Sequence, residues 1–145
     1  EANIIIKRYK IDIIQIPFSV IDRRILKNNW INEVKNKNIE LHVRSIFLQG
    51  CLLQNKNKIP GYFKKWKNFF NMWDLFCRKN NISKEGAAIK FIKNYNNVDK
   101  IILGVNSLKE LKKNINNFLD KRKINFPKNL KINDEKILNP YNWRV

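Results

Sequence analysis

Three short apolar runs alternate with segments of helical periodicity, and this alternation constrains the fold more than any other feature of the sequence. The runs cover residues 11–18, 39–47 and 98–103, and a proline or glycine lies near the end of each. Such runs are typical of strands buried on both faces of a parallel sheet. Because parallel strands need right-handed crossovers, we predict an α/β fold with about three parallel strands and flanking helices.

The segments between the runs carry apolar residues at helical spacing. Repeats of three and four residues predict helices over residues 21–35, 63–78, 84–94 and 108–118. Ser83 is a suitable N-cap, and Ser107 with Glu110 has the S-x-x-E form of a capping box. The polar stretch 54–60 runs into a proline-glycine pair, which predicts a loop before the second helix.

The size of the chain fits one domain. It has 145 residues, 43% of them hydrophobic, which is enough for a core of its own. We expect a body over residues 1–119 and a basic, irregular tail over 120–145 that packs on it through Leu138, Tyr141 and Trp143. Three parallel strands make an incomplete sheet, because both outer strands present unpaired apolar edges.

The chain is strongly basic. Its 30 Lys and Arg residues against 12 Asp and Glu give a formal net charge of +18, which is compatible with a polyanionic partner. Lysine, isoleucine and asparagine are abundant in every segment, a composition typical of an AT-rich genome, and we favour a solvated basic surface. A nucleic-acid interface at residues 62–67, where aromatic and basic side chains are interleaved, is the alternative. Those aromatic residues also fall on a helical stripe that packing would use.

Membrane spans and secretion are not indicated. No run approaches the roughly 18 apolar residues of a span, and the first residues lack the pattern of a secretory signal. We expect a cytoplasmic protein without a membrane partner. Cys51 and Cys77 show no C-x-x-C spacing, so we expect buried free thiols, with a disulfide only if the fold brings the two together.

Polar and small residues follow each predicted strand. Gln15 lies within the first, residues 44–50 close the second, and residues 104–107 follow the third. In βα barrels the active face lies at the carboxyl ends of the strands. Backbone N–H groups at a capped helix start, beside glycines, suit a phosphate or pyrophosphate group. The pattern therefore predicts cofactor binding at this edge of the sheet.

Residues 14–22, 39–53 and 98–107 resemble the last three barrel strands of the aldo/keto reductases, in that order and at about that family's spacing. The resemblance covers residues 7–118, with a weaker similarity of residues 138–143 to the family's C-terminal tail. It implies that residues 1–119 are the C-terminal half of a TIM-type (β/α)8 barrel. The first strand here would be the sixth strand of the full barrel.

The resemblance also implies an activity. Family members reduce aldehydes and ketones by hydride transfer from NAD(P)H, and a tyrosine of an Asp-Tyr-Lys-His tetrad protonates the carbonyl oxygen. All four tetrad residues belong to the N-terminal half, so no catalytic residue is assigned here. His42 lies in the strand that would be the seventh rather than the fourth, and we expect it to pack between strand and helix. Tyr62 is the nearest tyrosine, and nothing in the sequence orients it.

Several residues match the family's contacts to nicotinamide and pyrophosphate. Gln15 matches the glutamine that hydrogen-bonds the carboxamide, with a plain core glutamine as the alternative. Arg44 stands where many members stack a tyrosine on the nicotinamide; a guanidinium also stacks, but its charge disfavours the oxidised, cationic ring. The pyrophosphate loop, which a simple strand-to-loop turn would also explain, is matched by Ser45, Phe47, Gln49 and Gly50.

The adenosine end is matched at the start of the last helix. Gly104, Val105 and Asn106 correspond to the site around the adenosine phosphate, and Asn114 to the asparagine that contacts adenine. Glu110 lies where NADP-preferring members often carry arginine. A carboxylate there repels a 2′-phosphate and leans toward NAD, although its place in a capping box explains the same residue without a ligand.

The sequence is therefore interpreted as a fragment of an NAD(P)H-dependent oxidoreductase that carries the cofactor-binding half. We expect it to reduce a small carbonyl substrate only when the missing N-terminal half-barrel completes it. The alternatives are a basic nucleic-acid-binding protein and an inactive structural remnant.

Overall fold

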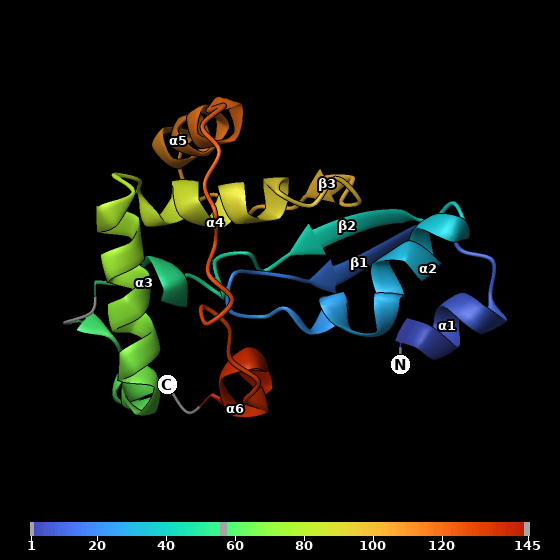
Figure 1. The fold of residues 1–145 in the computed structure, drawn as a ribbon, viewed down its shortest axis with the longest axis horizontal. Coiled ribbons are helices and arrows are strands. Elements are labelled where there is room, and N and C mark those ends of the chain that lie inside the picture. Colours follow the sequence, from blue (N-terminus) through green and yellow to red (C-terminus); the bar gives the residue numbers. More distant parts are fainter. Residues whose placement is uncertain (1, 56–57, 144–145) are drawn as a thin grey trace.

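Three parallel strands form one open sheet in the computed structural model, which describes residues 2–55 and 58–143 (Figure 1). The strands are β1 (Ile13–Pro17), β2 (Glu40–Arg44) and β3 (Lys100–Ile101), in the order β1-β2-β3. Gln15 pairs with His42, and His42 pairs with Lys100. The predicted α/β class with three parallel strands is confirmed. Lys56 and Asn57 of the predicted loop 54–60, and the last two residues of the predicted tail, lie outside the described residues.

Helices and single 3-10 turns connect and flank the strands. The helical elements are α1 (Ala2–Arg8), η1 (Arg24–Asn29), α2 (Trp30–Asn36), η2 (Cys51–Leu53), η4 (Gly61–Trp66), α3 (Lys67–Lys79), α4 (Lys84–Lys93), α5 (Leu108–Leu119), α6 (Glu135–Leu138) and η5 (Pro140–Asn142). In Figure 1, α4 runs above the sheet, α5 lies above α4, and α3 stands across their ends. None of the described helices is long and apolar enough to cross a membrane.

The two predicted helices with serine caps are confirmed. Ser83 Oγ accepts a hydrogen bond of 3.1 Å from Gly86 N at the start of α4, and Ser107 Oγ accepts one of 3.2 Å from Glu110 N at the start of α5. These bonds satisfy backbone donors that the first turn of a helix leaves free. The local sequence therefore fixes where both helices begin.

The predicted helix over residues 21–35 is wrong in its first half. Asn28 and Asn29 adopt positive φ values of 55° and 56°, so η1 ends there and α2 begins only at Trp30. Asparagine tolerates the left-handed region better than other non-glycine residues. The predicted helix over 63–78 begins as η4 and becomes α3 at Lys67, while α1 and α6 had not been predicted.

The predicted burial on both faces holds for the middle of β2, where Leu41, His42 and Val43 are all buried, and is wrong for the outer strands β1 and β3. Leu41 and Val43 are fully buried in the core, whereas Ile13 on the opposite face is 53% exposed. On that second face Gln15 is exposed as well, whereas His42 is buried beside Glu40. The third strand is also shorter than the predicted 98–103, since β3 covers only Lys100–Ile101. It is an edge strand without an outer neighbour, and Ile102 beside it is 42% exposed.

The C-terminal segment runs from α5 across the molecule to α6 (Figure 1) and contributes to the core. Leu138 is buried, and the Trp143 ring meets Phe63 edge-on at 4.9 Å while its Nε1 donates to Ile137 O at 3.0 Å. These two anchors are as predicted. Tyr141 is 97% exposed, so its predicted anchoring role is wrong. Asn139 caps the turn that carries Tyr141 and directs that side chain to solvent.

Lys90 of α4 binds the beginning of the C-terminal segment, at Asp120 and Arg122. It is only 3% exposed, and its Nζ donates to the backbone oxygens of Asp120 and Arg122 at 2.9 and 2.8 Å. The Asp120 carboxylate lies 3.1 Å from the same nitrogen. A buried lysine is tolerated here because its ammonium group has two carbonyl acceptors and an opposite charge.

Lys90→Met is expected to lower the free energy of unfolding by about 2 kcal/mol, because two part-buried carbonyls lose their donor. Urea denaturation of the wild type, Lys90→Met and the exposed control Lys112→Met measures this. Equal stability of all three proteins would show that the contacts of Lys90 do not hold the segment.

Cys51 and Cys77 are buried free thiols in the structure, as predicted. Burial raises the pKa of Cys51 to about 11 and that of Cys77 to about 12. For Cys77 the carboxylates of Asp74 and Glu85 add to this effect, and Lys84 opposes it. Since the thiolate is the reactive form, neither cysteine is suited to nucleophilic chemistry.

Reaction with a chromogenic disulfide reagent at pH 8 tests these thiols. Each is expected to react at least about a hundredfold more slowly in the native protein than in urea, because both the thiolate fraction and access are reduced. Fast native labelling of the Cys51→Ser or Cys77→Ser variant would contradict the burial of the remaining thiol.

Candidate functional site

A cavity of about 530 Å³ lies at the carboxyl ends of the strands. Its walls come from the end of β1, the turn after β2, the segment after β3, and the facing sides of α4 and α5. The predicted cofactor residues found in its lining are Gln15, Arg44, Ser45, Phe47, Gln49, Gly50, Gly104, Asn106, Glu110 and Asn114. Val105 is the one member of the predicted set that is absent from this lining, and it lines the neighbouring cavity instead. Parallel pairing thus brings together residues that lie up to about a hundred positions apart in the sequence.

The turn over residues 45–50 forms one wall of the cavity. The second strand was predicted to reach Phe47, but β2 ends at Arg44, and the residues that follow form this turn. Ser45, Leu48 and Gln49 take positive φ values of 57°, 48° and 52°, and Gly50 takes 81°. Leu48 N donates to Ser45 O at 2.8 Å. Ile46 and Leu48 are buried in the core, and this packing holds the strained backbone in place. The polar residues of the turn are thereby left on the cavity side.

The start of α5 forms the opposite wall. Glu110 Oε2 accepts a hydrogen bond of 2.9 Å from Asn106 N, and Ser107 Oγ caps Glu110 N. This arrangement is a capping box displaced by one residue. The predicted capping role of Glu110 is confirmed, and the carboxylate occupies the Asn106 N–H that phosphate binding would use. A Cβ built on Gly104 meets no atom within 4 Å, so the cavity has open space beside it.

Gln15 and Asn114 are two of the amide side chains in the lining for which the described residues provide no hydrogen-bond partner. Asn114 is buried and lies between this cavity and its neighbour. Gln15 is exposed on the open face of the sheet. An amide offers both a donor and an acceptor. Both residues are therefore free to bind a polar ligand, and their predicted cofactor contacts stay predictions.

His42 lies on the same face as Gln15, its partner across the β1–β2 pairing. Its Nε2 lies 2.8 Å from Glu40 Oε2, and Lys100 Nζ lies 3.3 Å from the same carboxylate oxygen. The hydrogen bond with His42, then Lys100, lowers the pKa of Glu40. His42 is buried, and it lies on the sheet face opposite to Leu41 and Val43 because side chains alternate along a strand. Its packing between strand and helix stays a prediction.

Tyr62 is outside the cavity. Its hydroxyl donates to Lys136 O at 2.8 Å, so it is oriented by the C-terminal segment rather than by any group of the site. No described residue of the lining is a tyrosine or histidine. The described lining therefore contains no tyrosine that could take the proton-donating role of the tetrad tyrosine.

Sequence reasoning missed an ion pair in the lining. Glu85 at the start of α4 and Lys113 on α5 both line the cavity, and Lys113 Nζ lies 2.7 Å from Glu85 Oε1. Burial opposes ionisation of Glu85, but the bond from Lys113, its own backbone N–H and Ser83 outweigh it and lower its pKa. The partners are 28 residues apart, and no local pattern pairs them. Ile46, Leu53, Ile102 and Leu103 complete the lining.

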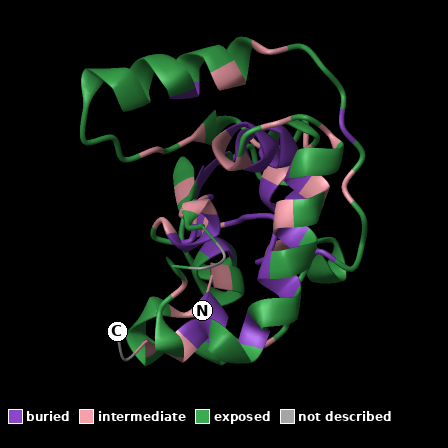
Figure 2. Cartoon of the chain, turned by 90° about the vertical axis from the view of Figure 1, so that its left-hand side faces the viewer, coloured by how far each residue is buried: buried purple, intermediate pink, exposed green. Residues whose placement is uncertain are grey.

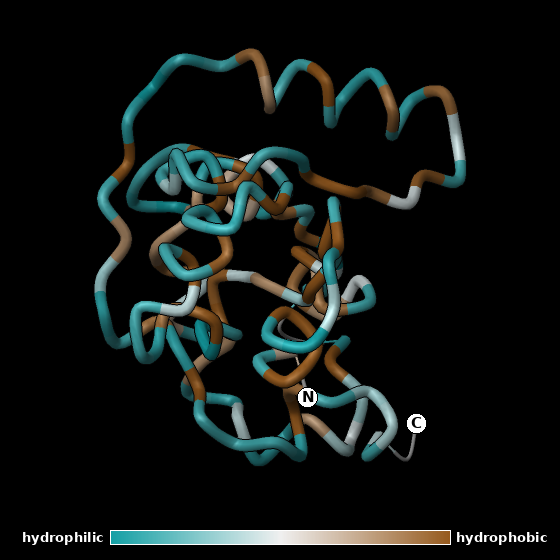
Figure 3. The backbone as a smooth tube through the Cα atoms, turned by 90° about the vertical axis from the view of Figure 1, so that its right-hand side faces the viewer, coloured by the Kyte–Doolittle hydropathy of each residue, from teal (hydrophilic) through white to brown (hydrophobic). Residues whose placement is uncertain are grey.

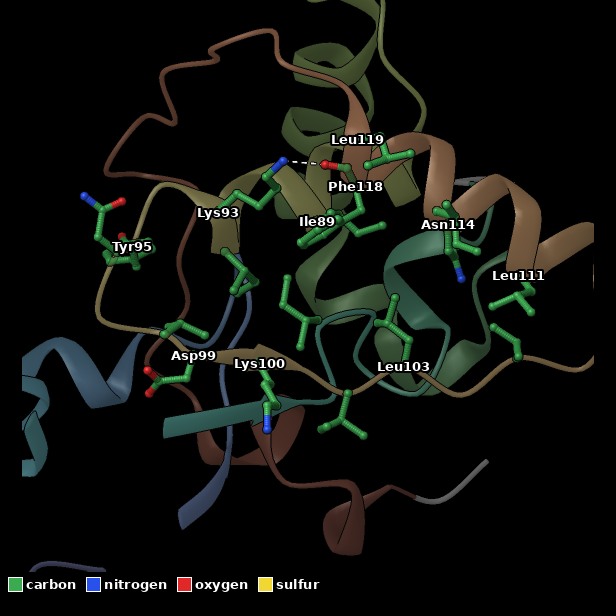
Figure 4. A pocket seen from close by; sticks show the side chains of 17 residues that line it. Ile89, Lys93, Tyr95, Asp99, Lys100, Leu103, Leu111, Asn114, Phe118 and Leu119 are labelled. Carbon is green, nitrogen blue, oxygen red and sulfur yellow. Dashed lines mark hydrogen bonds between the residues drawn. The ribbon is translucent and has the colours of Figure 1, made fainter. Parts of the chain in front are cut away.

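A second cavity, of about 640 Å³, lies between α4, residues 98–105 and α5 (Figure 4). Apolar side chains dominate its wall, and Lys93 Nζ donates to Phe118 O at one end. The apolar side of α5 is only partly covered: Leu111, Ile115 and Phe118 are all exposed. Figure 2 shows α5 as a mainly exposed helix, and Figure 3 shows hydrophobic residues alternating with hydrophilic ones along it. The helix is therefore held mainly by its cap and by α4.

The aldo/keto reductase family model matches residues 5–129, which include all three strands and both cavities. The chain belongs to the aldo/keto reductase family. No curated protein matches it significantly. As a family member it has three parallel strands in one open sheet with flanking helices, consistent with part of a TIM-type barrel. Aldo/keto reductases generally use NAD(P)H, and the cavity lies at the strand ends where such barrels bind ligands.

Ser107→Ala is expected to destabilise α5 by about 1 kcal/mol, because Glu110 N loses its cap. Hydrogen exchange of the α5 amides should accelerate, while exchange in α3 stays unchanged. Ser45→Ala, which removes a hydroxyl from the opposite wall without a helix cap, is the control. Unchanged α5 exchange in Ser107→Ala would show that the cap does not hold this wall.

Proposed function

We propose that this chain is the cofactor-binding half of an NAD(P)H-dependent aldo/keto reductase. It would reduce an aldehyde or ketone only when completed by the missing N-terminal half-barrel. The observation that carries the proposal is the cavity at the strand ends, whose lining includes all of the predicted cofactor residues except Val105. We further propose that the protein acts in the cytoplasm.

The lining supports a division of roles. Gln15 would bind the nicotinamide carboxamide through its free amide, and Arg44 would stack on the ring from the neighbouring strand. Ser45 and Gln49 would contact the pyrophosphate from the turn after β2. Asn114 would contact the adenine from α5. When bound, the cofactor supplies the hydride, and these residues orient it.

Completion by a second half-barrel is supported by three surfaces that the described residues leave open. Ile13 and Gln15 are exposed on one face of the sheet, β3 has no outer neighbour, and the apolar side of α5 is exposed. Parallel sheets are normally covered on both faces, and edge strands are normally protected. We propose that the strands and helices of the missing half cover these surfaces and bring the proton donor.

The nucleic-acid alternative loses its main support in the structure. Phe63 and Trp66, the aromatic residues of the basic segment 62–67, are buried in the core, and the Tyr62 hydroxyl is bonded to Lys136. Stacking on bases needs exposed aromatic faces. The net charge of +18 alone would support only non-specific, salt-sensitive contacts.

Titration with NADH, followed by cofactor fluorescence and calorimetry, tests the proposal. The chain is expected to bind NADH at moderate salt without turning over a carbonyl substrate. Gln15→Ala is expected to weaken binding about tenfold, since one polar contact to the cofactor is lost. Asn55→Ala, outside the cavity lining, serves as the matched amide control. Absence of binding by the folded wild type, or retention on DNA as the only activity, would overturn the proposal.

A further inference from the structure

The ion pair between Glu85 and Lys113 stands at one end of the candidate cavity. Glu85 comes from the first turn of α4 and Lys113 from the middle of α5. The helices approach closely here, since a Cβ on Gly86 would lie 2.8 Å from Asn117 Oδ1. The Lys113 side chain is 50% exposed and that of Glu85 24% exposed. The pair is thus accessible from the cavity and held by closely spaced helices.

This end of the cavity is where the adenosine part of the cofactor would lie under the proposed function. Lys113 precedes Asn114, the proposed adenine contact, and follows Glu110 by one helical turn. The charged groups that α4 and α5 contribute to the lining are Glu85, Glu110 and Lys113. These two helices therefore contribute two carboxylates and one ammonium group to the lining, and the ammonium group contacts Glu85. The Lys113 charge is already compensated at 2.7 Å.

The two carboxylates have different tasks. Glu110 accepts from Asn106 N and completes the cap of α5, which explains it as a structural residue. Glu85 has no partner from the α5 cap, and the only side chain of α5 that bonds to it among the described residues is Lys113. The pKa of Glu85 is lowered despite burial, so the carboxylate stays ionised at neutral pH. Glu85 is therefore the group that determines where Lys113 points.

We propose that Glu85 is a positioning residue that sets the preference of this chain for NADH over NADPH. It holds Lys113 in an ion pair, and so neutralises the one cation that α4 and α5 contribute to the described cavity lining and that could bind a 2′-phosphate. An added phosphate would meet two carboxylates and a compensated lysine, while the 2′-hydroxyl of NADH meets no such repulsion. The inference rests on the proposed cofactor function and extends it to cofactor choice.

The experiment compares NADH and NADPH dissociation constants for the full chain and its variants by calorimetry. Glu85→Gln keeps the size and polarity of the side chain but frees the Lys113 charge. It is expected to tighten NADPH binding about tenfold and to change NADH binding by less than about twofold, since one charge-assisted contact is gained. Lys113→Met added to Glu85→Gln is expected to abolish the gain. Lys112→Met in the same background, an exposed lysine outside the lining, is expected to keep it.

The possible results separate the two proposals. If the folded wild type binds neither cofactor, the proposed function fails and this inference fails with it. If it binds NADH but the NADPH-to-NADH ratio is unchanged in Glu85→Gln, only the role of Glu85 is refuted. A purely structural role would weaken both cofactors equally, or lower the melting temperature without changing the ratio. That result would also overturn the inference.

Discussion

The parallel pairing of β1, β2 and β3 is the constraint on which the rest of this structure depends. Parallel strands all end at the same edge, so the residues after each strand must meet there. Gln15, the turn over 45–50 and the segment 104–106 come together for this reason alone. The pairing also sets the face on which each side chain lies, because Gln15 opposite His42 leaves Leu41 and Val43 to the core. One register thus decides both the core and the candidate site.

Local interactions then shape the edge that pairing creates. On one wall, buried Ile46 and Leu48 hold a turn with several residues at positive φ. On the other, Ser107 and Glu110 fix the start of α5. The ion pair of Glu85 and Lys113 joins α4 to α5 across the end of the cavity. Each of these interactions contributes little stability by itself, but together they hold the walls of one cavity.

The same architecture leaves apolar surface exposed. Ile13 is exposed on the sheet, β3 has no outer neighbour among the described strands, and α5 is only half-covered. No described residue of the cavity wall is a tyrosine or histidine, and His42 is engaged with Glu40. The open edges are consistent with part of the TIM-type barrel of the aldo/keto reductase family.

The sequence by itself determined the order of strands and helices, the two serine caps and the grouping of the candidate cofactor residues. Apolar periodicity, capping chemistry and parallel topology are local or simple rules, and residues such as Ser83, Ser107 and Gln15 follow them. Only the tertiary structure decided that Asn28 and Asn29 break a helix, that His42 faces away from the core, and that Glu85 meets Lys113. These outcomes depend on which layers are present and on how helices distant in sequence approach each other. The arrangement of layers and the approach of distant helices are not encoded in any local sequence pattern.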